Sequence, residues 1–229
     1  MSQPKLGTLT IGQAPRADIT PILDAYLPAH VPVVHMGVLD GLDRDAIACA
    51  FAPQAGNGVL ISRLLSGDSV ELDKPAIQQA LQAKLHALEA LGCTVILILC
   101  TGEFEGLVCR HAWLVEPDRI VPPTAAALAG ERQVGIVVPL AGQIESEVHK
   151  WGALQRPPIC AAASPYAAGV EGDEALANAA LALREQGAQM LVLDCMGFVE
   201  RHREIAQAAS NLPVLLSNML VARLTATLM

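Results

Sequence analysis

The sequence predicts an α/β protein with two similar lobes, in each of which helices cover a doubly wound, mostly parallel sheet. The first observation behind this prediction is an internal repeat, because residues 88–102 align without gaps on residues 183–197. The second is the order of patterns in each copy, where a helical period is followed by a glycine and then by a continuous apolar run of strand length. Such runs are typical of parallel strands that helices cover on both faces.

The chain of 229 residues is long enough for two small lobes that share one fold. We expect the first lobe over residues 1–122 together with 213–229, and the second over residues 123–212. A hairpin excursion from the first sheet is expected at about 56–73, where two short strand patterns flank a turn that contains Gly67. By this division, the last strand and helix return to the first lobe.

The elements of the first lobe follow from apolar periodicity and from turn residues. A helix is expected to start near Asp43, and Gly92 is expected to end another helix in a left-handed conformation. In chain order, we predict strands at 5–12, 31–37, 59–65, 69–72 and 95–99, and helices after the turn at 13–18, at 42–50 and at 81–91.

The second lobe repeats this order in a shorter form. Residues 133–143 resemble the first strand and turn, with Gly135 in the place of Gly7. Two polar residues are expected to cap helices: Thr124 after the paired prolines, and Asn218 before the last helix. We predict strands from 133, at 159–163, at 190–193 and from 212, and helices at 125–128, up to 154, at 175–184, from 200 and at 219–228.

Composition and charge exclude several classes of partner. Apolar residues make up 52% of the chain and aromatic residues 3%, so the core is aliphatic. The net charge of −8 argues against nucleic acid and against an anionic membrane surface. No apolar run is long enough to span a bilayer and the amino terminus lacks a signal-peptide pattern, so we expect a cytoplasmic protein. The six cysteines form no C-x-x-C pair, so neither a metal site nor a disulfide framework is expected.

Two cysteines, Cys100 and Cys195, follow the repeated strands and are therefore the candidate catalytic residues. Ligands of open α/β sheets bind at the carboxyl ends of the strands, so two thiols in matching places can face each other across one cleft. Each is followed, two residues later, by a flexible glycine, Gly102 or Gly197. The alternative is that both are merely buried, as free cysteines often are.

The turn after the first strand is a candidate anion site. Gly12, Gln13 and Arg16 lie where we expect a strand to meet the amino terminus of a helix, with free backbone N–H groups and a guanidinium nearby. Such a place suits a carboxylate or a phosphate. The alternative for Arg16 is a solvated residue in the first turn. Neither a Walker loop nor a G-x-G-x-x-G motif follows the strand, so nucleotide binding has no support.

Other candidates for substrate binding lie close to the predicted strand ends. Arg63 is a cation within an apolar strand, either exposed at an edge or directed at a ligand. Thr101 is either a donor to a substrate carboxylate or a strand terminator, and His202 either tunes the second thiol or is exposed. The remaining predicted contacts flank the two thiols or end the first strand of the second lobe: Gly102, Pro139, Met196 and Gly197.

A thiol in each lobe suits one specific chemistry. Racemising or isomerising a carbon beside a carboxylate without a cofactor requires one group to remove a proton from one face and a second group to supply one to the other face. Thiols suit both roles because nearby cations and helix amino termini bring their pKa toward neutrality. The carboxylate charge of the intermediate would then be held by backbone amides and by Arg16.

Eight short segments, distributed along nearly the whole chain, carry a resemblance to a known family. They are Thr10–Arg16, Ser62–Leu64, Cys100–Phe104, Val121–Pro123, Gln133–Pro139, Leu193–Phe198, His202–Arg203 and Pro213–Asn218. Together they resemble the AroM family. That family itself resembles the aspartate/glutamate racemase superfamily, which implies two pseudo-symmetric flavodoxin-like domains. In its two-thiol members each domain supplies one catalytic cysteine, which implies that Cys100 and Cys195 are the proton acceptor and donor.

The leading hypothesis is thus a cofactor-independent isomerase or racemase that acts at the α-carbon of a small carboxylate. A second enzymatic hypothesis is a decarboxylase or a cis-trans isomerase that uses one thiol as proton donor or nucleophile. The hypothesis from another class is a non-catalytic protein that binds and senses a small carboxylate. A homodimer is the default expectation for the assembly.

Overall fold

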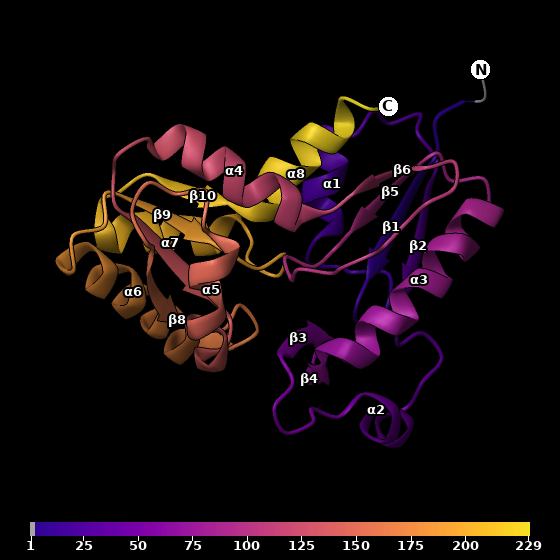
Figure 1. The fold of residues 1–229 in the computed structure, drawn as a ribbon, viewed down its shortest axis with the longest axis horizontal. Coiled ribbons are helices and arrows are strands. Elements are labelled where there is room, and N and C mark those ends of the chain that lie inside the picture. Colours follow the sequence, from indigo (N-terminus) through magenta and orange to yellow (C-terminus); the bar gives the residue numbers. More distant parts are fainter. Residues whose placement is uncertain (1–2) are drawn as a thin grey trace. The chain divides into compact units, whose positions relative to one another are not determined.

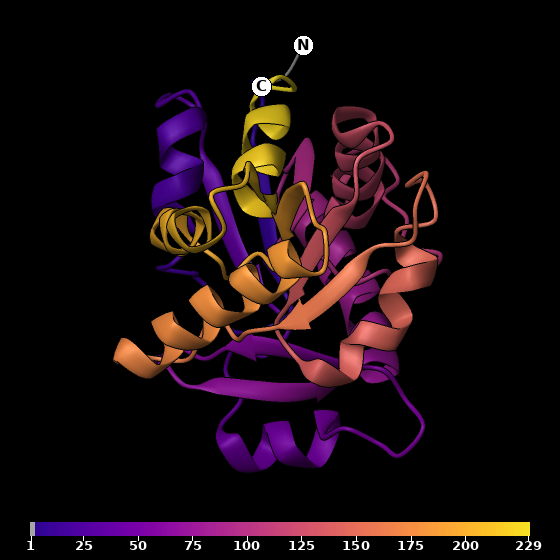
Figure 2. The ribbon, with the colours of Figure 1, turned by 90° about the vertical axis from the view of Figure 1, so that its left-hand side faces the viewer.

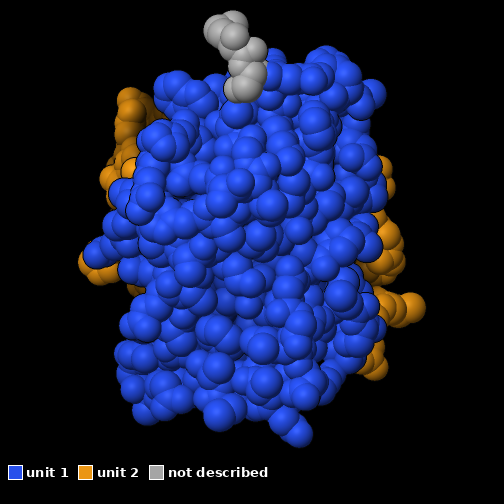
Figure 3. All heavy atoms as spheres, turned by 90° about the vertical axis from the view of Figure 1, so that its right-hand side faces the viewer, with its two compact units in different colours: residues 1–116, 222–229 blue, residues 117–221 orange. Residues whose placement is uncertain are grey.

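The computed structural model describes residues 3–229, and the chain divides into two compact units (Figures 1 and 3). The first unit comprises residues 1–116 and 222–229, and the second comprises residues 117–221. None of the helices in residues 3–229 combines the length and the apolar character needed to cross a bilayer.

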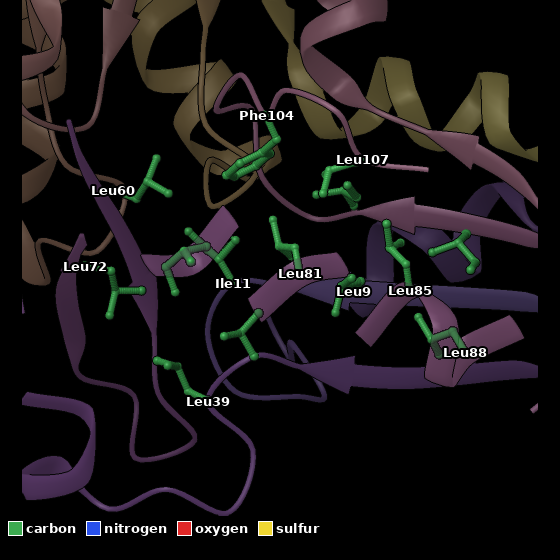
Figure 4. Packing of buried hydrophobic residues seen from close by; sticks show 14 of the residues in the cluster. Leu9, Ile11, Leu39, Leu60, Leu72, Leu81, Leu85, Leu88, Phe104 and Leu107 are labelled. Atoms are coloured by element: carbon green, nitrogen blue, oxygen red, sulfur yellow. The ribbon is translucent and has the colours of Figure 1, made fainter. Parts of the chain in front are cut away.

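The first unit has a four-stranded parallel sheet whose buried central strands determine its core. The strand order is β2 (Val33–Gly37), β1 (Leu6–Thr10), β5 (Val95–Ile98) and β6 (Trp113–Val115). The helices are α1 (Thr20–Tyr26), α2 (Arg44–Phe51) and α3 (Lys74–Ala90). Helix α3 has buried residues at helical spacing, Ile77, Leu81, Leu85 and Leu88, and these join the apolar cluster shown in Figure 4. Helix α2 begins next to Asp43, as predicted, and Asp43 caps it by accepting from the Ala46 N–H.

The predicted hairpin is confirmed as β3 (Val59–Arg63) and β4 (Ser69–Asp73), which pair antiparallel. Leu60 and Leu72 belong to the same buried cluster as Ile11, which follows β1, and Phe104, which follows β5 (Figure 4). The hairpin therefore packs at the carboxyl end of the first sheet, the edge at which ligands bind in open α/β sheets.

The second unit has a parallel sheet in the order β8 (Ile159–Ala162), β7 (Val134–Val138), β9 (Met190–Leu193) and β10 (Val214–Leu216). Its helical segments are α4 (Pro117–Ala129), η1 (Ala141–Gln143), α5 (Ile144–Lys150), α6 (Gly169–Glu185) and α7 (Glu200–Ser210), while α8 (Ser217–Ala226) begins in this unit and ends in the first. Helix α6 packs across β7 and β8 (Figure 2) and buries Leu176, Ala180 and Leu183.

The two sheets show the internal repeat in three dimensions. The order β2-β1-β5-β6 corresponds to β8-β7-β9-β10, and the strands before the two thiols occupy the same place. In the first lobe a Cβ on Gly7 would lie 3.1 Å from the Cys93 sulfur and 3.2 Å from Leu88. In the second, a Cβ on Gly135 would meet the repeat counterparts of these residues, Ala188 and Leu183, at 3.1 and 3.2 Å. The predicted fold of two similar αβ lobes is confirmed.

The boundaries between the two units differ from the expected ones, which lay after residue 122 and before residue 213. Strand β10 pairs with β9, so residues 213–216 extend the second sheet, and only 222–229 belong to the first unit. The reason is the repeat itself, since β10 is the counterpart of β6 and completes its own sheet. The other boundary lies after Glu116.

Two predicted caps are wrong. Helix α4 begins at Pro117 and contains Pro122 and Pro123, so Thr124 lies inside the helix. The burial of one face, which includes Val121 and Ala125, stabilises the helix although two prolines lack a donor. Helix α8 begins at Ser217, so Asn218 is also inside its helix, and its side-chain amide donates to the Met196 and Phe198 carbonyls instead.

Candidate active site

Both candidate thiols lie just beyond the carboxyl ends of equivalent strands. Cys100 follows β5 and Cys195 follows β9. The Gly102 N–H donates to the Cys100 sulfur over 3.3 Å, and the Gly197 N–H donates to the Cys195 sulfur over 3.4 Å. The same tight turn therefore occurs in both lobes. A donor directed at a sulfur favours its thiolate form, which is the reactive form of a cysteine.

The hairpin forms one wall of the turn at Cys100. Cys100 is half-buried and Thr101 is buried. A Cβ on Gly102 would lie 3.0 Å from Leu60 of β3 and 3.4 Å from the Cys100 sulfur. The absence of a side chain at Gly102 thus allows the hairpin and the thiol to approach the same turn.

Polar side chains of α3 hold the segment that leaves Cys100. Gln78 exchanges two hydrogen bonds with the backbone of Glu105, and Gln82 does the same with Val108. Glu89 accepts from the His111 and Ala112 N–H groups at 2.6 and 3.0 Å. These contacts fix residues 105–112 to the helix.

The pKa of Glu89 reports the strength of this anchor. Desolvation raises the pKa of its carboxyl, but the backbone N–H groups of Ala112, His111 and Arg110 outweigh that effect and lower the pKa to about 2. Glu89 is therefore ionised at neutral pH.

Arg16 lies in the turn that leads into a helix, as predicted. Helix α1 begins at Thr20, and the Arg16 carbonyl accepts from the Ile19 and Thr20 N–H groups at 3.0 and 2.9 Å. Arg16 is 4% exposed, which excludes the solvated alternative. Its Nε and Nη2 bind both carboxylate oxygens of Asp18 at 2.9 and 2.7 Å. Whether Arg16 also contacts a substrate stays a prediction.

The Arg16 guanidinium connects the end of β1 to the hairpin. Its Nη1 donates to the hydroxyls of Thr10 and Ser62, each over 3.3 Å. These hydroxyls supply further acceptors for a buried cation. The residue therefore stabilises the turn of the first lobe.

Gly12 and Gln13 also connect this turn to the hairpin. A Cβ on Gly12 would lie 2.4 Å from the Ser62 hydroxyl and 2.5 Å from the Arg63 carbonyl. The Gln13 side chain accepts from the Leu65 N–H at 2.9 Å and donates to the Leu42 carbonyl at 3.0 Å. These contacts give both residues a structural role in the lobe, and their contact with substrate stays a prediction.

Arg63, on β3, is half-buried. Its Nε donates to the Gly67 carbonyl over 2.9 Å, within the turn of its own hairpin, and its carbonyl accepts from the Gln13 N–H over 3.3 Å. The side chain thus helps to close the hairpin, while the predicted contact with a ligand stays a prediction.

Cys195 has an aromatic neighbour that the sequence did not indicate. The residue is 8% exposed and belongs to the buried apolar cluster of the second unit. The Tyr166 hydroxyl lies 3.9 Å from its sulfur. A Cβ on Gly197 would lie 2.5 Å from the same hydroxyl, so this glycine allows the ring to pack there. The available signal was a Ser-Pro-Tyr loop after a strand in a chain with two tyrosines.

A buried ion pair lies directly beside the second thiol. The Lys150 ammonium, at the end of α5, binds the Asp194 carboxylate, and their side chains are 6% and 1% exposed. The Asp194 N–H donates to the Val137 carbonyl, continuing the pairing of β9 with β7. The signal in the sequence was an acidic residue between the apolar strand and Cys195.

The remaining predicted site residues support the second turn. Pro139 and Met196 are buried, and the Met196 carbonyl accepts from Asn218 over 3.0 Å. His202 is half-buried rather than exposed, because its Nδ1 caps α7 by accepting from the Val199 N–H over 2.9 Å. Burial, and then the charge of Arg201, lower its pKa below the usual value.

Among the side chains that the structure describes, which leave out those of residues 1–2 and 147–148, no three histidine, cysteine or acidic groups lie together so that they could hold a metal ion. No disulfide joins any two of the six cysteines in the described structure.

The fold is similar to those of solved racemases and of a decarboxylase. Allantoin racemase from Pseudomonas fluorescens superposes with a TM-score of 0.66 at 15% identity, covering 98% of this chain and 90% of that one. Picrophilus torridus aspartate racemase gives 0.58 at 12% identity, covering 97% and 93%. Arylmalonate decarboxylase gives 0.57 at 14% identity, covering 98% and 91%. At these identities the likeness shows the fold, which is of the aspartate/glutamate racemase type.

The comparison of sequences gives the family. No curated protein matches the chain. The family model described as AroM protein matches residues 6–229, which is nearly the entire sequence. The chain therefore belongs to the AroM family, as the eight segments along its sequence predicted.

Proposed function

We propose that this protein is a cofactor-independent isomerase or racemase that acts at the α-carbon of a small carboxylate. The observation that carries the proposal is the pair of matching turns, each with a cysteine beyond an equivalent strand and a glycine N–H directed at its sulfur. The solved racemases with this fold support the same class of reaction.

In the proposed reaction, one cysteine is a thiolate and the other a thiol. The thiolate removes the α-proton from one face of the substrate and becomes a thiol, while the electron pair of the C–H bond delocalises into the carboxylate. The second thiol then donates its proton to the opposite face and becomes a thiolate. No atom is gained or lost, and the two cysteines exchange protonation states.

The extra charge of the intermediate requires donors at the carboxylate. We propose that Thr101 and the backbone N–H group of Met196 supply them, because preorganised donors stabilise a developing anion. The N–H groups of Gly102 and Gly197 are directed at the two sulfurs instead. Pro139 is proposed to border the same ligand. The partner is thus a small carboxylate, and no cofactor takes part.

A second candidate has specific support from the fold. Arylmalonate decarboxylase shares it, and a decarboxylation needs only one thiol, which protonates the carbanion left after CO₂ departs. The two reactions differ in their demand for the other cysteine.

The test is proton exchange in D₂O, followed by NMR, over a panel of small chiral carboxylates. With the wild-type protein, the substrate is expected to incorporate deuterium at its α-carbon, and its solution is expected to lose optical rotation. Cys100→Ser and Cys195→Ser are each expected to lower racemisation by at least about 10³-fold, since a serine hydroxyl is a far weaker acid at neutral pH. Cys49→Ser, which alters an exposed cysteine, is the control and keeps full activity.

Other outcomes identify the alternatives. Release of CO₂ from a malonate that depends on only one of the two cysteines indicates the decarboxylase. Carboxylate binding without exchange, and unchanged in both variants, contradicts catalysis and indicates a sensor.

A further inference from the structure

We infer that Tyr166 is a positioning residue for the second thiol: its hydroxyl donates to the Cys195 sulfur and, together with the Gly197 N–H, holds that sulfur as a thiolate. The inference rests on the proposed function in treating Cys195 as a reacting group. It adds a residue that neither the repeat nor the motifs indicated.

The first support is the arrangement of two polar groups around one sulfur. The Tyr166 oxygen lies 3.9 Å from Cys195 Sγ, and the Gly197 nitrogen lies 3.4 Å from the same atom. Both groups can donate a hydrogen bond. A large, polarisable thiolate accepts from both, whereas a neutral thiol is a weak acceptor. The pair of donors therefore favours the charged form.

The second support is that the loop is built to hold the phenol there. The Tyr166 N–H donates to the Ser164 hydroxyl over 3.2 Å, which fixes the start of the loop between β8 and α6. A Cβ on Gly197 would come within 2.5 to 2.7 Å of three atoms of the tyrosine, Oη, Cε1 and Cζ. Glycine is thus required here for the space that its missing side chain leaves to the phenol.

The charged groups near this turn leave the titration of the thiol readable. Asp194 is paired with Lys150. His202 caps α7 through Nδ1, and burial lowers its pKa. His202 therefore loses its charge at a lower pH than an ordinary histidine does.

The experiment is alkylation of Cys195 by iodoacetamide as a function of pH, in the Cys100→Ser background, with mass spectrometry to locate the label. Tyr166→Phe removes one oxygen atom and keeps the ring. We expect the pH midpoint of labelling to rise by about one unit, and the rate at pH 7 to fall by about threefold to tenfold. Gly197→Ala, which displaces the phenol, is expected to shift the midpoint in the same direction.

Tyr26→Phe is the matched control, because Tyr26 is the other tyrosine of the chain and its hydroxyl accepts from Arg223 in the first unit. It should leave the midpoint unchanged. A midpoint in Tyr166→Phe within about 0.2 units of the parent would overturn the inference, as would an equal shift in the control.

The labelling requires no substrate, so the two proposals fail separately. Absence of α-proton exchange in wild type counts against the proposed function, whereas an unshifted midpoint counts against the role of Tyr166. The circular dichroism spectrum of Tyr166→Phe is compared with that of the parent. Matching spectra show that a change in the pH midpoint does not result from misfolding of the variant.

Discussion

The two lobes share a backbone frame and differ in the charges buried around it. In both, a strand ends in a cysteine whose sulfur accepts from the glycine two residues later. At the position before the cysteine, the first lobe has the buried Leu99, and the second has Asp194 in a buried ion pair with Lys150. Both residues donate their N–H to the equivalent carbonyl, at 2.8 and 2.9 Å.

This difference between the lobes shows which features the turn at each cysteine requires. The parallel pairing, the glycine and the thiol recur in both lobes, so they form the minimal turn. The buried charges vary: the first lobe holds Arg16 and Asp18 at the end of β1, and the second holds Lys150 and Asp194 beside β9. We interpret these pairs as lobe-specific means of fixing each turn, since a buried charge requires a partner.

The largest expected effect comes from breaking the pair in the second lobe. Lys150→Met leaves the Asp194 carboxylate without its cation, and we expect a loss of about 3–5 kcal/mol in the free energy of unfolding. Arg44→Met is the control, because the Arg44–Asp68 pair is exposed at 69% and 55% and is expected to contribute at most about 1 kcal/mol. Urea unfolding measures both.

A second variant makes the second lobe resemble the first. The double change Lys150→Met with Asp194→Leu introduces the residue found at position 99 and removes both charges. It is expected to recover most of the stability lost in Lys150→Met. If the double variant is as unstable as Lys150→Met, the unpaired Asp194 carboxylate is not the cause of the lost stability.

An intermediate effect is expected at the turn after β1. Gly12→Ala places a Cβ within 2.5 Å of the hairpin, so Ser62 and the backbone of Arg63 must move, at a cost of about 1–3 kcal/mol. Gly142→Ala in the second lobe meets no atom within 4 Å and should change the stability by less than about 0.5 kcal/mol. Equal unfolding midpoints for the two variants would show that the hairpin moves to accommodate the added methyl group without a loss of stability.

The smallest effect is a dependence of stability on pH in the first lobe. The pKa of Glu89 is about 2 in the folded chain and near 4.5 in the unfolded chain. Its contribution is therefore complete above pH 4.5 and is lost as the pH falls toward 2. Glu89→Gln is expected to be less stable than wild type at pH 7 and equal to it at pH 2. A difference that persists unchanged at pH 2 would exclude the carboxylate as its source.

Local sequence patterns predicted the strands, the turns and the positions of the two thiols. The side-chain contacts around these turns depend on packing between residues that are distant along the chain. Apolar runs and the glycines at 92 and 187 sufficed to place both strands and both thiols, because these signals lie within one segment. The partners of Arg16 and Asn218 did not follow from the sequence, since Ser62 and Met196 are distant along the chain. Tyr166 was missed for the same reason: a single tyrosine in a loop does not show which thiol it will approach.

The central claim is that the sulfurs of Cys100 and Cys195 act on one small ligand. Treatment with 1,3-dibromoacetone, whose three-carbon chain joins two thiols that share a small-molecule site, tests it most directly. We predict a Cys100–Cys195 link within one chain, identified by mass spectrometry of tryptic peptides, slowed by a bound carboxylate and absent in Cys100→Ser. Two cysteines that each react singly with iodoacetamide but are never linked would contradict the claim.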